Sequence, residues 1–308
     1  MKLSVIIPYC NEYPQIIFTV QNIMTELEGI DAEVITISNK GNIPFTTKDG
    51  TIIPDYGFWK LQNSSYAKTG KLKNIRYDDK QGHWGAKNAG IKLATGKRLL
   101  FIDSHCVVSK NAILDMMNTP CEGSLHMQIH YMLDTKPLIY SARPESMHYT
   151  FAGCPSGKTS PFQVPVMSTC GMMIERKTLD HIGKWNPELG IYGGGENYMM
   201  YKLGTCGYPI QIHHTAALYH YAEKRGYSWN YDDHVRNQFI AAYCVGGEEW
   251  LQVLAEERKI KKNSNKVRID EIADDVRAKC QEDRDYIKSI QKYTIAEYFK
   301  MWEGKNYI

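Results

Sequence analysis

The order of apolar and polar positions in the first third of the chain predicts a parallel α/β sheet. Four short apolar runs have the length of buried strands: Leu3–Pro8, Glu33–Ile37, Leu72–Tyr77 and Arg98–Ile102. Residues 14–28 and 84–95 show helical patterns, the first with apolar side chains every three or four positions. Residues 40–70 are rich in Gly, Pro, Thr, Ser and Lys, so a loop or an insertion is expected there. In sheets of this kind ligands bind beyond the carboxyl ends of the strands.

The second half of the chain predicts longer strands, followed by helices. The strands are expected at Ser124–Leu133, Lys136–Arg143, Val166–Glu175 and Tyr208–His213, with an irregular loop over residues 144–165. The helices are expected at Glu196–Leu203 and, beyond residue 230, at residues 232–256, 268–291 and 293–303. We therefore predict an α/β domain over residues 1–229 and a C-terminal helical region over residues 230–308.

Composition and charge are those of an ordinary globular protein. Hydrophobic residues make up 43% of the 308 residues and charged residues 23%. A formal net charge of +3 excludes nucleic-acid binding driven by overall charge alone. Apolar runs are too short for a transmembrane helix or a signal-peptide core, so we expect a cytoplasmic protein. The eight cysteines are scattered, without a Cys-x-x-Cys pair, which favours free thiols.

The most informative residues are Asp103, Ser104 and His105, which directly follow the fourth predicted strand. Residues i and i+2 of an extended segment point the same way, so Asp103 and His105 can hold one divalent cation between them. A carboxylate and an imidazole suit Mn²⁺, with Mg²⁺ as the alternative. Such a cation would neutralise the charge that develops on a UDP leaving group. The structural alternative is that Asp103 or Ser104 caps a following helix.

Further motifs occur in a fixed order around this one. They are Ser4–Glu12, Gly85–Lys97 leading into Phe101–His105, Tyr192–Asn197 leading into Gly204–Tyr208, and His220–Tyr227. The first two resemble the opening strand and the metal-motif helix of family 2 glycosyltransferases. The Asp-Ser-His sequence and the last two segments resemble the polypeptide N-acetylgalactosaminyltransferases. The resemblance covers roughly residues 3–228 and implies a GT-A fold, the Rossmann-like mixed-sheet fold of nucleotide-diphospho-sugar transferases.

The resemblance also implies an activity. It implies metal-dependent transfer of a sugar from a UDP-sugar, with retention of the anomeric configuration, and a metal site that His220 completes. Two features depart from the family. Ser38 and Asn39 stand where family 2 enzymes usually carry acidic residues. We expect neither the membrane anchor nor the C-terminal lectin domain of the family's animal members, so a polypeptide acceptor does not follow.

Residues at the carboxyl ends of the strands are candidates for the donor site. The nucleotide-sugar candidates in this part of the chain are Pro8, Tyr9, Asn11, Glu12, Asn39, Gly85, Asn88, Asp103 and Ser104. Asn11 and Glu12 suit hydrogen bonds to ribose and base, although they also suit a helix cap. Gly85 and Asn88 open a helix whose N-terminus favours anions. Lys87 suits either the diphosphate or a solvated helix surface.

The triple glycine before Glu196 predicts a place where backbone and substrate come close. Glu196 would be the general base of an inverting enzyme, whereas in the retaining family that the chain resembles it would hold the sugar. The alternative for Glu196 is a helix cap. Asn197 would orient the sugar or the acceptor, beside Gly194 and Gly195. Trp185 and Tyr192 would stack on sugar faces, with core packing as the alternative.

Three residues after His220 are expected to close over the diphosphate: Lys224, Arg225 and Tyr227. A solvated charged turn is the alternative for this segment. His83 is expected to contact the nucleotide. His213 and His214 are expected to be structural, because adjacent residues of a strand point to opposite faces.

Together these features predict a metal-dependent glycosyltransferase that moves a sugar from a UDP-sugar to an acceptor hydroxyl. The acceptor stays open between a saccharide, a Ser/Thr side chain and a hydroxylated base of a nucleic acid. The basic connector at residues 257–268 keeps nucleic acid among these classes. The alternatives are a nucleotidyltransferase-like protein and a non-catalytic protein that binds nucleotide-sugars. The first does not explain Gly193–Asn197 or His220, and the intact set of Asp103, His105, His220 and Glu196 argues against the second.

Overall fold

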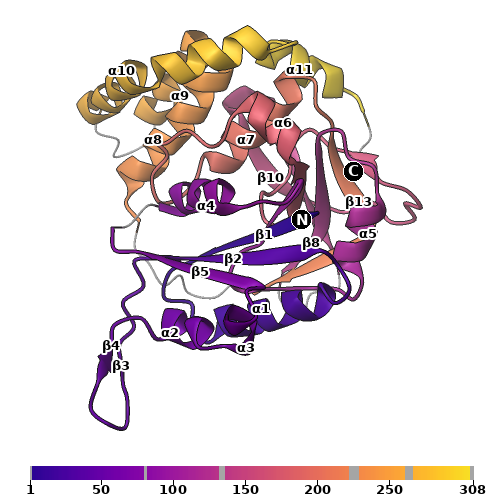
Figure 1. Ribbon diagram of the computed structural model, residues 1–308. Helices are drawn as coiled ribbons and strands as arrows, with labels where there is room; N and C mark the ends of the chain where they lie inside the picture. Colours follow the sequence, from indigo (N-terminus) through magenta and orange to yellow (C-terminus); the bar gives the residue numbers. More distant parts are fainter. Residues whose placement is uncertain (1, 80–81, 132–135, 222–228, 261–265, 306–308) are drawn as a thin grey trace.

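The computed structural model describes residues 2–79, 82–131, 136–221, 229–260 and 266–305. Its centre is one mixed sheet of 11 strands, covered by helices on both faces (Figure 1). The main path through the sheet runs β10-β9-β8-β12-β6-β1-β2-β5. Neighbours along this path are parallel at one end of the sheet and antiparallel at the other, which is the mixed α/β architecture that the sequence predicts.

The first third of the chain builds the parallel end. Its strands are β1 (Leu3–Tyr9), β2 (Ala32–Asn39), β5 (Leu72–Tyr77) and β6 (Arg98–Phe101). Its main helices are α1 (Gln15–Glu26) and α4 (Gly82–Leu93), which lie on opposite faces of the sheet (Figure 1). Because both faces are covered, every residue of β1 is buried, which explains its continuous apolar run. The predicted strands and helices of this part are confirmed to within a few residues.

The segment over residues 40–70, predicted as a loop or an insertion, is not a continuous loop, because it contains four short elements. They are β3 (Phe45–Thr46), β4 (Ile52–Ile53), α2 (Tyr56–Gln62) and α3 (Ser65–Lys68). β3 and β4 form a separate two-stranded hairpin that projects from the body of the molecule (Figure 1). The Asp55 carboxylate accepts from the Phe58 N–H and caps α2, and Ser64 caps α3 in the same way. Ser64, one of the polar residues that suggested a loop, is therefore a helix cap.

The second end of the sheet is largely antiparallel. Its strands are β7 (Cys106–Val108), β8 (Ser124–Tyr131), β9 (Leu138–Arg143), β10 (His148–Gly153), β11 (Phe162–Gln163), β12 (Met172–Glu175) and β13 (Ile210–His220). Three predictions need correction. The expected irregular loop contains a 3-10 turn, η1 (Pro144–Ser146), and β10. Only the end of the strand expected at Val166–Glu175 forms, as β12. Strand β13 reaches His220 instead of ending at His213.

Most helices of the second half stack over the α4 face of the sheet (Figure 1). They are α6 (Arg176–Ile182), α7 (Gly195–Thr205), α8 (Tyr231–Ala241), α9 (Glu248–Ile260), α10 (Lys266–Ile290) and α11 (Ile295–Trp302). Helix α5 (Ala112–Asn118) lies apart from this stack, and neither α5 nor α6 was predicted. The single helix expected over residues 232–256 is interrupted by a π-helical turn, η2 (Ala242–Gly246), and by Gly247, whose φ is 96°. One continuous hydrophobic core joins β1 to α11. The division at residue 229 stays a prediction.

All eight cysteines are free thiols, in agreement with the sequence. Among the described residues, no helix combines the length and the apolar character that crossing a membrane requires.

Candidate functional site

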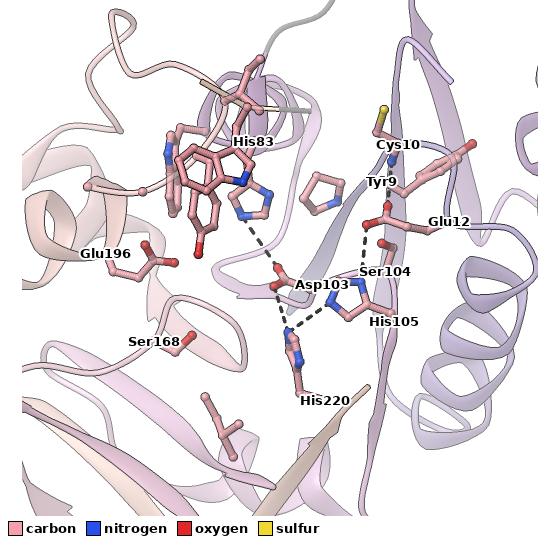
Figure 2. A pocket seen from close by; sticks show the side chains of 18 of the residues that line it. Tyr9, Cys10, Glu12, His83, Asp103, Ser104, His105, Ser168, Glu196 and His220 are labelled. Atoms are coloured by element: carbon pink, nitrogen blue, oxygen red, sulfur yellow. Dashed lines mark hydrogen bonds and ion pairs between the residues drawn. The ribbon is translucent and has the colours of Figure 1, made fainter. Parts of the chain in front are cut away.

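Asp103 lies just beyond the carboxyl end of β6. Strand β6 is parallel to β1, so the chain leaves the sheet at the edge where β1 and β2 also end. The Asp103 N–H donates to the sulfur of Cys170 at 3.3 Å, which ties this turn to the segment before β12. The Asp103 carboxylate lies 3.7 Å from His220 Nε2 and 3.8 Å from His83 Nε2 (Figure 2). A strand end therefore delivers the carboxylate into a group of imidazoles.

Strand pairing brings His105 and His220 together. β7 begins directly after His105, and Cys106 pairs with His220 at the end of the antiparallel strand β13. The Nε2 atoms of the two histidines are 3.1 Å apart. Asp103, His105 and His220 each offer one ligand atom, and these atoms lie within 4.8 Å of one another. Two imidazole nitrogens and a carboxylate oxygen that converge in this way fit a divalent transition-metal ion such as Mn²⁺.

Glu12 lies behind His105 rather than among the ligand atoms. The Glu12 carboxylate accepts from the Cys10 N–H at 2.7 Å, and its other oxygen is 3.5 Å from His105 Nδ1 (Figure 2). A carboxylate on the Nδ1 side holds the proton there and leaves Nε2 as the metal-facing nitrogen. Glu12 was predicted to bind ribose and base, and that role stays a prediction beside this contact.

Lys87 is fully buried and does not reach the cavity as a diphosphate ligand would. Its ammonium donates to Thr169 Oγ1 at 2.9 Å and lies 3.9 Å from Asp103 Oδ1. Burial would raise the pKa of the Asp103 carboxyl. The Lys87 ammonium and the imidazoles around it outweigh burial and hold the pKa of Asp103 well below its usual value. The carboxylate is therefore charged, as a metal ligand must be.

A cavity of about 970 Å³ surrounds these groups. At one end it is lined by predicted donor-site residues, namely Pro8, Tyr9, Asn11, Glu12, Asn39 and Ser104. Asn11 has a left-handed φ of 62°, and its side-chain oxygen accepts from the Asn42 N–H at 2.6 Å. The Asn39 amide donates to the Gly82 carbonyl at 3.0 Å, across the entry to α4. These bonds fix the polar edge where a nucleotide would lie, while the binding roles themselves stay predictions.

Strand β2 ends in Ser38 and Asn39 rather than in acidic residues, but a buried carboxylate from another segment, that of Asp55, lies against Ser38. The Ser38 hydroxyl donates a hydrogen bond to the carboxylate of Asp55, a residue that is only 3% exposed. Asp55 follows Ser38 by 17 positions and caps α2, so it could not be recognised from the residues of the strand itself.

The other end of the cavity is aromatic, and the sequence analysis missed most of it. Besides Tyr192, which was predicted, its lining includes Tyr131, Tyr140, His148, Tyr149, Phe151, Trp229 and His234. The rings of Tyr140 and Tyr149 stack with centroids 4.2 Å apart. Burial, together with the nearby Glu196 carboxylate, raises the pKa of Tyr131 to about 12. The abundance of tyrosine, 21 residues, was the only sequence signal for this wall.

Glu196 faces the metal-ligand group from the opposite side of the cavity (Figure 2). It sits in the first turn of α7, where Gly194 adopts a left-handed φ of 72°. A Cβ atom on Gly194 would lie 2.3 Å from the Asn237 carbonyl oxygen, so α8 presses against this turn. Asn197 lines the cavity and donates to the Met147 carbonyl at 2.6 Å. The glycines thus serve the approach of α8 to the start of α7.

Four candidates are not among the residues that line the cavity: Gly85, Asn88, Trp185 and Gly195. The prediction that Trp185 stacks on a sugar is wrong, because its ring is 2% exposed and its indole donates to the Gly195 carbonyl. The Asn88 amide donates to the Trp185 carbonyl at 2.8 Å instead of facing a nucleotide. A Cβ atom on Gly195 would lie 2.2 Å from the Trp84 ring. These residues form the packing behind the site.

Other predicted residues fall elsewhere. Lys224, Arg225 and Tyr227 lie outside the described residues. His83 lines the cavity beside Asp103, as its predicted contact with a nucleotide requires. The His213 Nδ1 atom accepts from the Ala216 N–H at 3.0 Å, in agreement with a structural role.

Comparison with known proteins identifies the same relatives that the motifs suggested. The family model described as Glycosyl transferase family 2 matches residues 59–183. Human polypeptide N-acetylgalactosaminyltransferase 14 is 23% identical over 201 residues, which are 60% of this chain and 36% of that protein. Polypeptide N-acetylgalactosaminyltransferase 11 of Xenopus tropicalis is 24% identical over 172 residues, 50% of this chain and 28% of that protein. The chain thus spans about a third of the length of the curated relatives it matches.

Solved structures confirm the GT-A fold. GalNAc-T7 with UDP, GalNAc and Mn²⁺ superposes with a TM-score of 0.73 at 16% identity, over 97% of this chain and 56% of that one. Residues 1–349 of S. aureus TarS with UDP-GlcNAc give a TM-score of 0.56 at 15% identity, over 100% and 93% of the two chains. The mannosyltransferase PcManGT of Pyrobaculum calidifontis with GDP-Man and Mn²⁺ gives 0.52 at 13% identity, over 99% and 88%. The chain has the GT-A fold, and its sequence resembles the polypeptide N-acetylgalactosaminyltransferases.

Proposed function

We propose that this chain transfers a sugar from a UDP-sugar to an acceptor hydroxyl, with a divalent cation held by Asp103, His105 and His220. The observation that carries the proposal is the convergence of these three ligand atoms within 4.8 Å, inside a cavity between polar donor-site residues and Glu196. Of the three related structures named above, GalNAc-T7 contains UDP and TarS contains UDP-GlcNAc, whereas PcManGT contains GDP-Man; GalNAc-T7 and PcManGT also contain Mn²⁺. These contents support the choice of nucleotide and of metal for this chain.

Each part of the cavity has a role in this proposal. When bound, the cation would neutralise negative charge on the leaving diphosphate. Glu12 orients His105, and Lys87 keeps Asp103 ionised without touching the substrate. Tyr9, Asn11 and Asn39 form the polar end that would take the nucleoside. The sugar would then lie toward Glu196 and Asn197, at the junction with the aromatic end.

Glu196 suits two mechanisms that differ in stereochemistry. As a base it would take the proton of the acceptor hydroxyl while that oxygen attacks the anomeric carbon, and the configuration would invert. As a ligand of the sugar hydroxyls it would only position the donor, which accords with retention. The likeness to N-acetylgalactosaminyltransferases favours retention. The acceptor itself, a saccharide, a Ser/Thr side chain or a hydroxylated nucleic-acid base, is not fixed by these residues.

The C-terminal helices belong to the acceptor side in this proposal. Trp229, just before α8, and His234, in the first turn of α8, line the cavity and pack against the ring of Tyr192. We therefore propose that residues 230–308 complete the acceptor site rather than form an independent unit.

Release of UDP from a panel of UDP-sugars tests the function. We expect UDP release with one or more of them in the presence of Mn²⁺, and none after chelation or in the Asp103→Asn variant. The α or β configuration of the product, read by NMR, decides the role of Glu196. If no UDP-sugar releases UDP with any of the three acceptor classes present, the glycosyltransferase proposal fails.

A further inference from the structure

The insertion between β2 and β5 carries the basic excess of the whole chain. Residues 40–71, named here the basic insertion, contain two aspartates and five lysines: Lys40, Lys48, Lys60, Lys68 and Lys71. Their net charge of +3 equals that of the full chain, so the remaining residues sum to zero. One of the two aspartates, Asp55, is buried against Ser38. The surface of the basic insertion is therefore positive on an otherwise balanced molecule.

These five charges are available to a ligand. All five lysines are exposed, and within the described ranges none of their ammonium groups lies in an ion pair. The basic connector behaves differently where it is described. Lys259 pairs with Glu256 and Asp270, and Arg268 pairs with Asp232 and Glu271. Lys259 and Arg268 are therefore less available to a nucleic acid than the five lysines of the basic insertion.

Aromatic rings form a ladder on the basic insertion. Phe45 stacks on Tyr56 with centroids 4.2 Å apart and an interplanar angle of 24°. Tyr56 in turn lies 6.0 Å from Trp59 at 14°, so three rings are close to parallel. The Lys60 ammonium lies over the last two rings, at 5.4 and 5.8 Å from their centroids. Phe45 is 39% exposed, so the outer end of the ladder is open to solvent.

The ladder leads to the cavity. Tyr13 contacts Tyr56 edge-on with centroids 4.7 Å apart, and Tyr13 itself lines the cavity. Asn42, at the start of the basic insertion, is hydrogen-bonded to Asn11 of the donor end. The hairpin β3–β4 extends this surface away from the sheet (Figure 1). A polymer bound along the ladder would therefore pass beside the mouth of the site.

We propose that the basic insertion, together with Tyr13, binds single-stranded nucleic acid. Parallel aromatic rings give bases a stacking surface, and unpaired lysines beside them neutralise phosphates. A second copy of the chain is the other possible occupant, because Ile43 and Ile52 on the same segment are exposed. Two copies that met through this segment would bring net charges of +3 against each other, which disfavours that occupant. The idea that this surface presents an acceptor base to the cavity rests on the proposed function. Binding of single-stranded nucleic acid to the basic insertion does not.

Fluorescence anisotropy with a fluorescein-labelled oligothymidylate of about 12 nucleotides tests the proposal. We expect saturable binding by the wild type, weakened about tenfold or more when salt rises from about 50 to about 200 mM. The Lys48→Glu/Lys60→Glu variant is expected to lose about tenfold or more in affinity. Phe45→Ala is expected to lose at least about fivefold, because one stacking surface is removed. A duplex of the same length should bind more weakly than the single strand.

A matched control separates this surface from general charge. Lys92→Glu/Lys110→Glu makes the same change of charge at two exposed lysines outside the basic insertion and should leave affinity within about twofold. Unchanged thermal unfolding and unchanged UDP binding show that each variant is folded with an intact donor site. No oligothymidylate binding by the wild type, or equal losses in both double variants, overturns the proposal. The proposal is also overturned if light scattering shows that the wild type is a dimer that does not bind nucleic acid and that Phe45→Ala is a monomer. If UDP fails to bind while oligothymidylate binds, only the proposed function falls.

Discussion

The two ends of the cavity are built in different ways. At the donor end, Tyr9, Asn39 and Asp103 each lie at or directly after the end of a parallel strand, so the topology of the sheet alone brings them to one edge. At the aromatic end, Tyr131, Tyr149 and His234 come from β8, β10 and α8. Their meeting depends on antiparallel pairing and on a helix beyond residue 230. The donor end thus follows from the order of parallel strands, whereas the aromatic end depends on contacts between segments far apart in the chain, and we propose that it takes the acceptor.

The largest expected effect lies at the junction of the two ends, in Glu196→Gln. Sugar transfer should fall by roughly a hundredfold to ten-thousandfold if the carboxylate acts on the proton or positions the sugar. Steady-state kinetics would show the fall in kcat, while calorimetry should show UDP binding within about twofold of wild type, since Glu196 lies across the cavity from the donor-end residues. Activity that survives this substitution would remove Glu196 from the site.

The stability of the parallel end is expected to depend on Glu33. Its carboxylate is 1% exposed, accepts from Ser4 and Thr95, and lies 2.6 Å from the Lys73 ammonium. Burial opposes the charge, but these partners prevail and lower the pKa of Glu33 to about 2. A lowered folded-state pKa stabilises the protein fully above about pH 4.5, and this contribution is lost as the pH falls toward about 2.

Urea unfolding of Glu33→Gln measures this effect. The free energy of unfolding should be about 3 kcal/mol lower than that of wild type at pH 7, and the gap should close as the pH falls below about 4. Glu28→Gln, at an exposed position after α1, is the control and should change stability by less than about 0.5 kcal/mol. A gap that does not change with pH would contradict the role of the ionised carboxylate.

Lys87→Met tests whether the donor end depends on a charge that never touches the ligand. Without the Lys87 ammonium the pKa of Asp103 rises, so protons compete with the cation at higher pH. Mn²⁺-dependent UDP affinity should fall roughly tenfold to a hundredfold, and its loss on acidification should begin at higher pH than in wild type. Lys92→Met, at an exposed position of the same helix, should change neither. An unaltered pH profile in Lys87→Met would mean that Lys87 serves packing alone.

The smallest effect is expected at the aromatic end. Phe151 is 53% exposed and packs edge-on against Tyr131 and Tyr140. With an identified acceptor, Phe151→Ala should raise the acceptor KM about threefold to tenfold and leave hydrolysis of the donor without acceptor unchanged. If donor hydrolysis falls instead, the aromatic end also acts on the donor, and the assignment of donor and acceptor to separate ends of the cavity is wrong.

What could be predicted from the sequence follows the same division. Asp103 and His105 were predictable because strand and ligand are adjacent in sequence, and His220 because a motif resemblance covers it. His234, which lines the cavity, and Asp55, which is buried against Ser38, were not predictable, since their contacts join positions far apart in the chain. Trp185 and Asn88 were misplaced for a related reason. Their sequence surroundings suit a sugar site, but whether they face the cavity or the core depends on how α4 packs against α7.

Calorimetric titration of UDP, with and without Mn²⁺, on wild type and on Asp103→Ala, tests the central claim most directly. We predict that wild type binds UDP more tightly with Mn²⁺ than without it, and that Asp103→Ala loses this difference while remaining folded. The absence of UDP binding to wild type under both conditions, or equal Mn²⁺ dependence in the variant, would contradict the assignment of Asp103, His105 and His220 as the metal-bearing donor site.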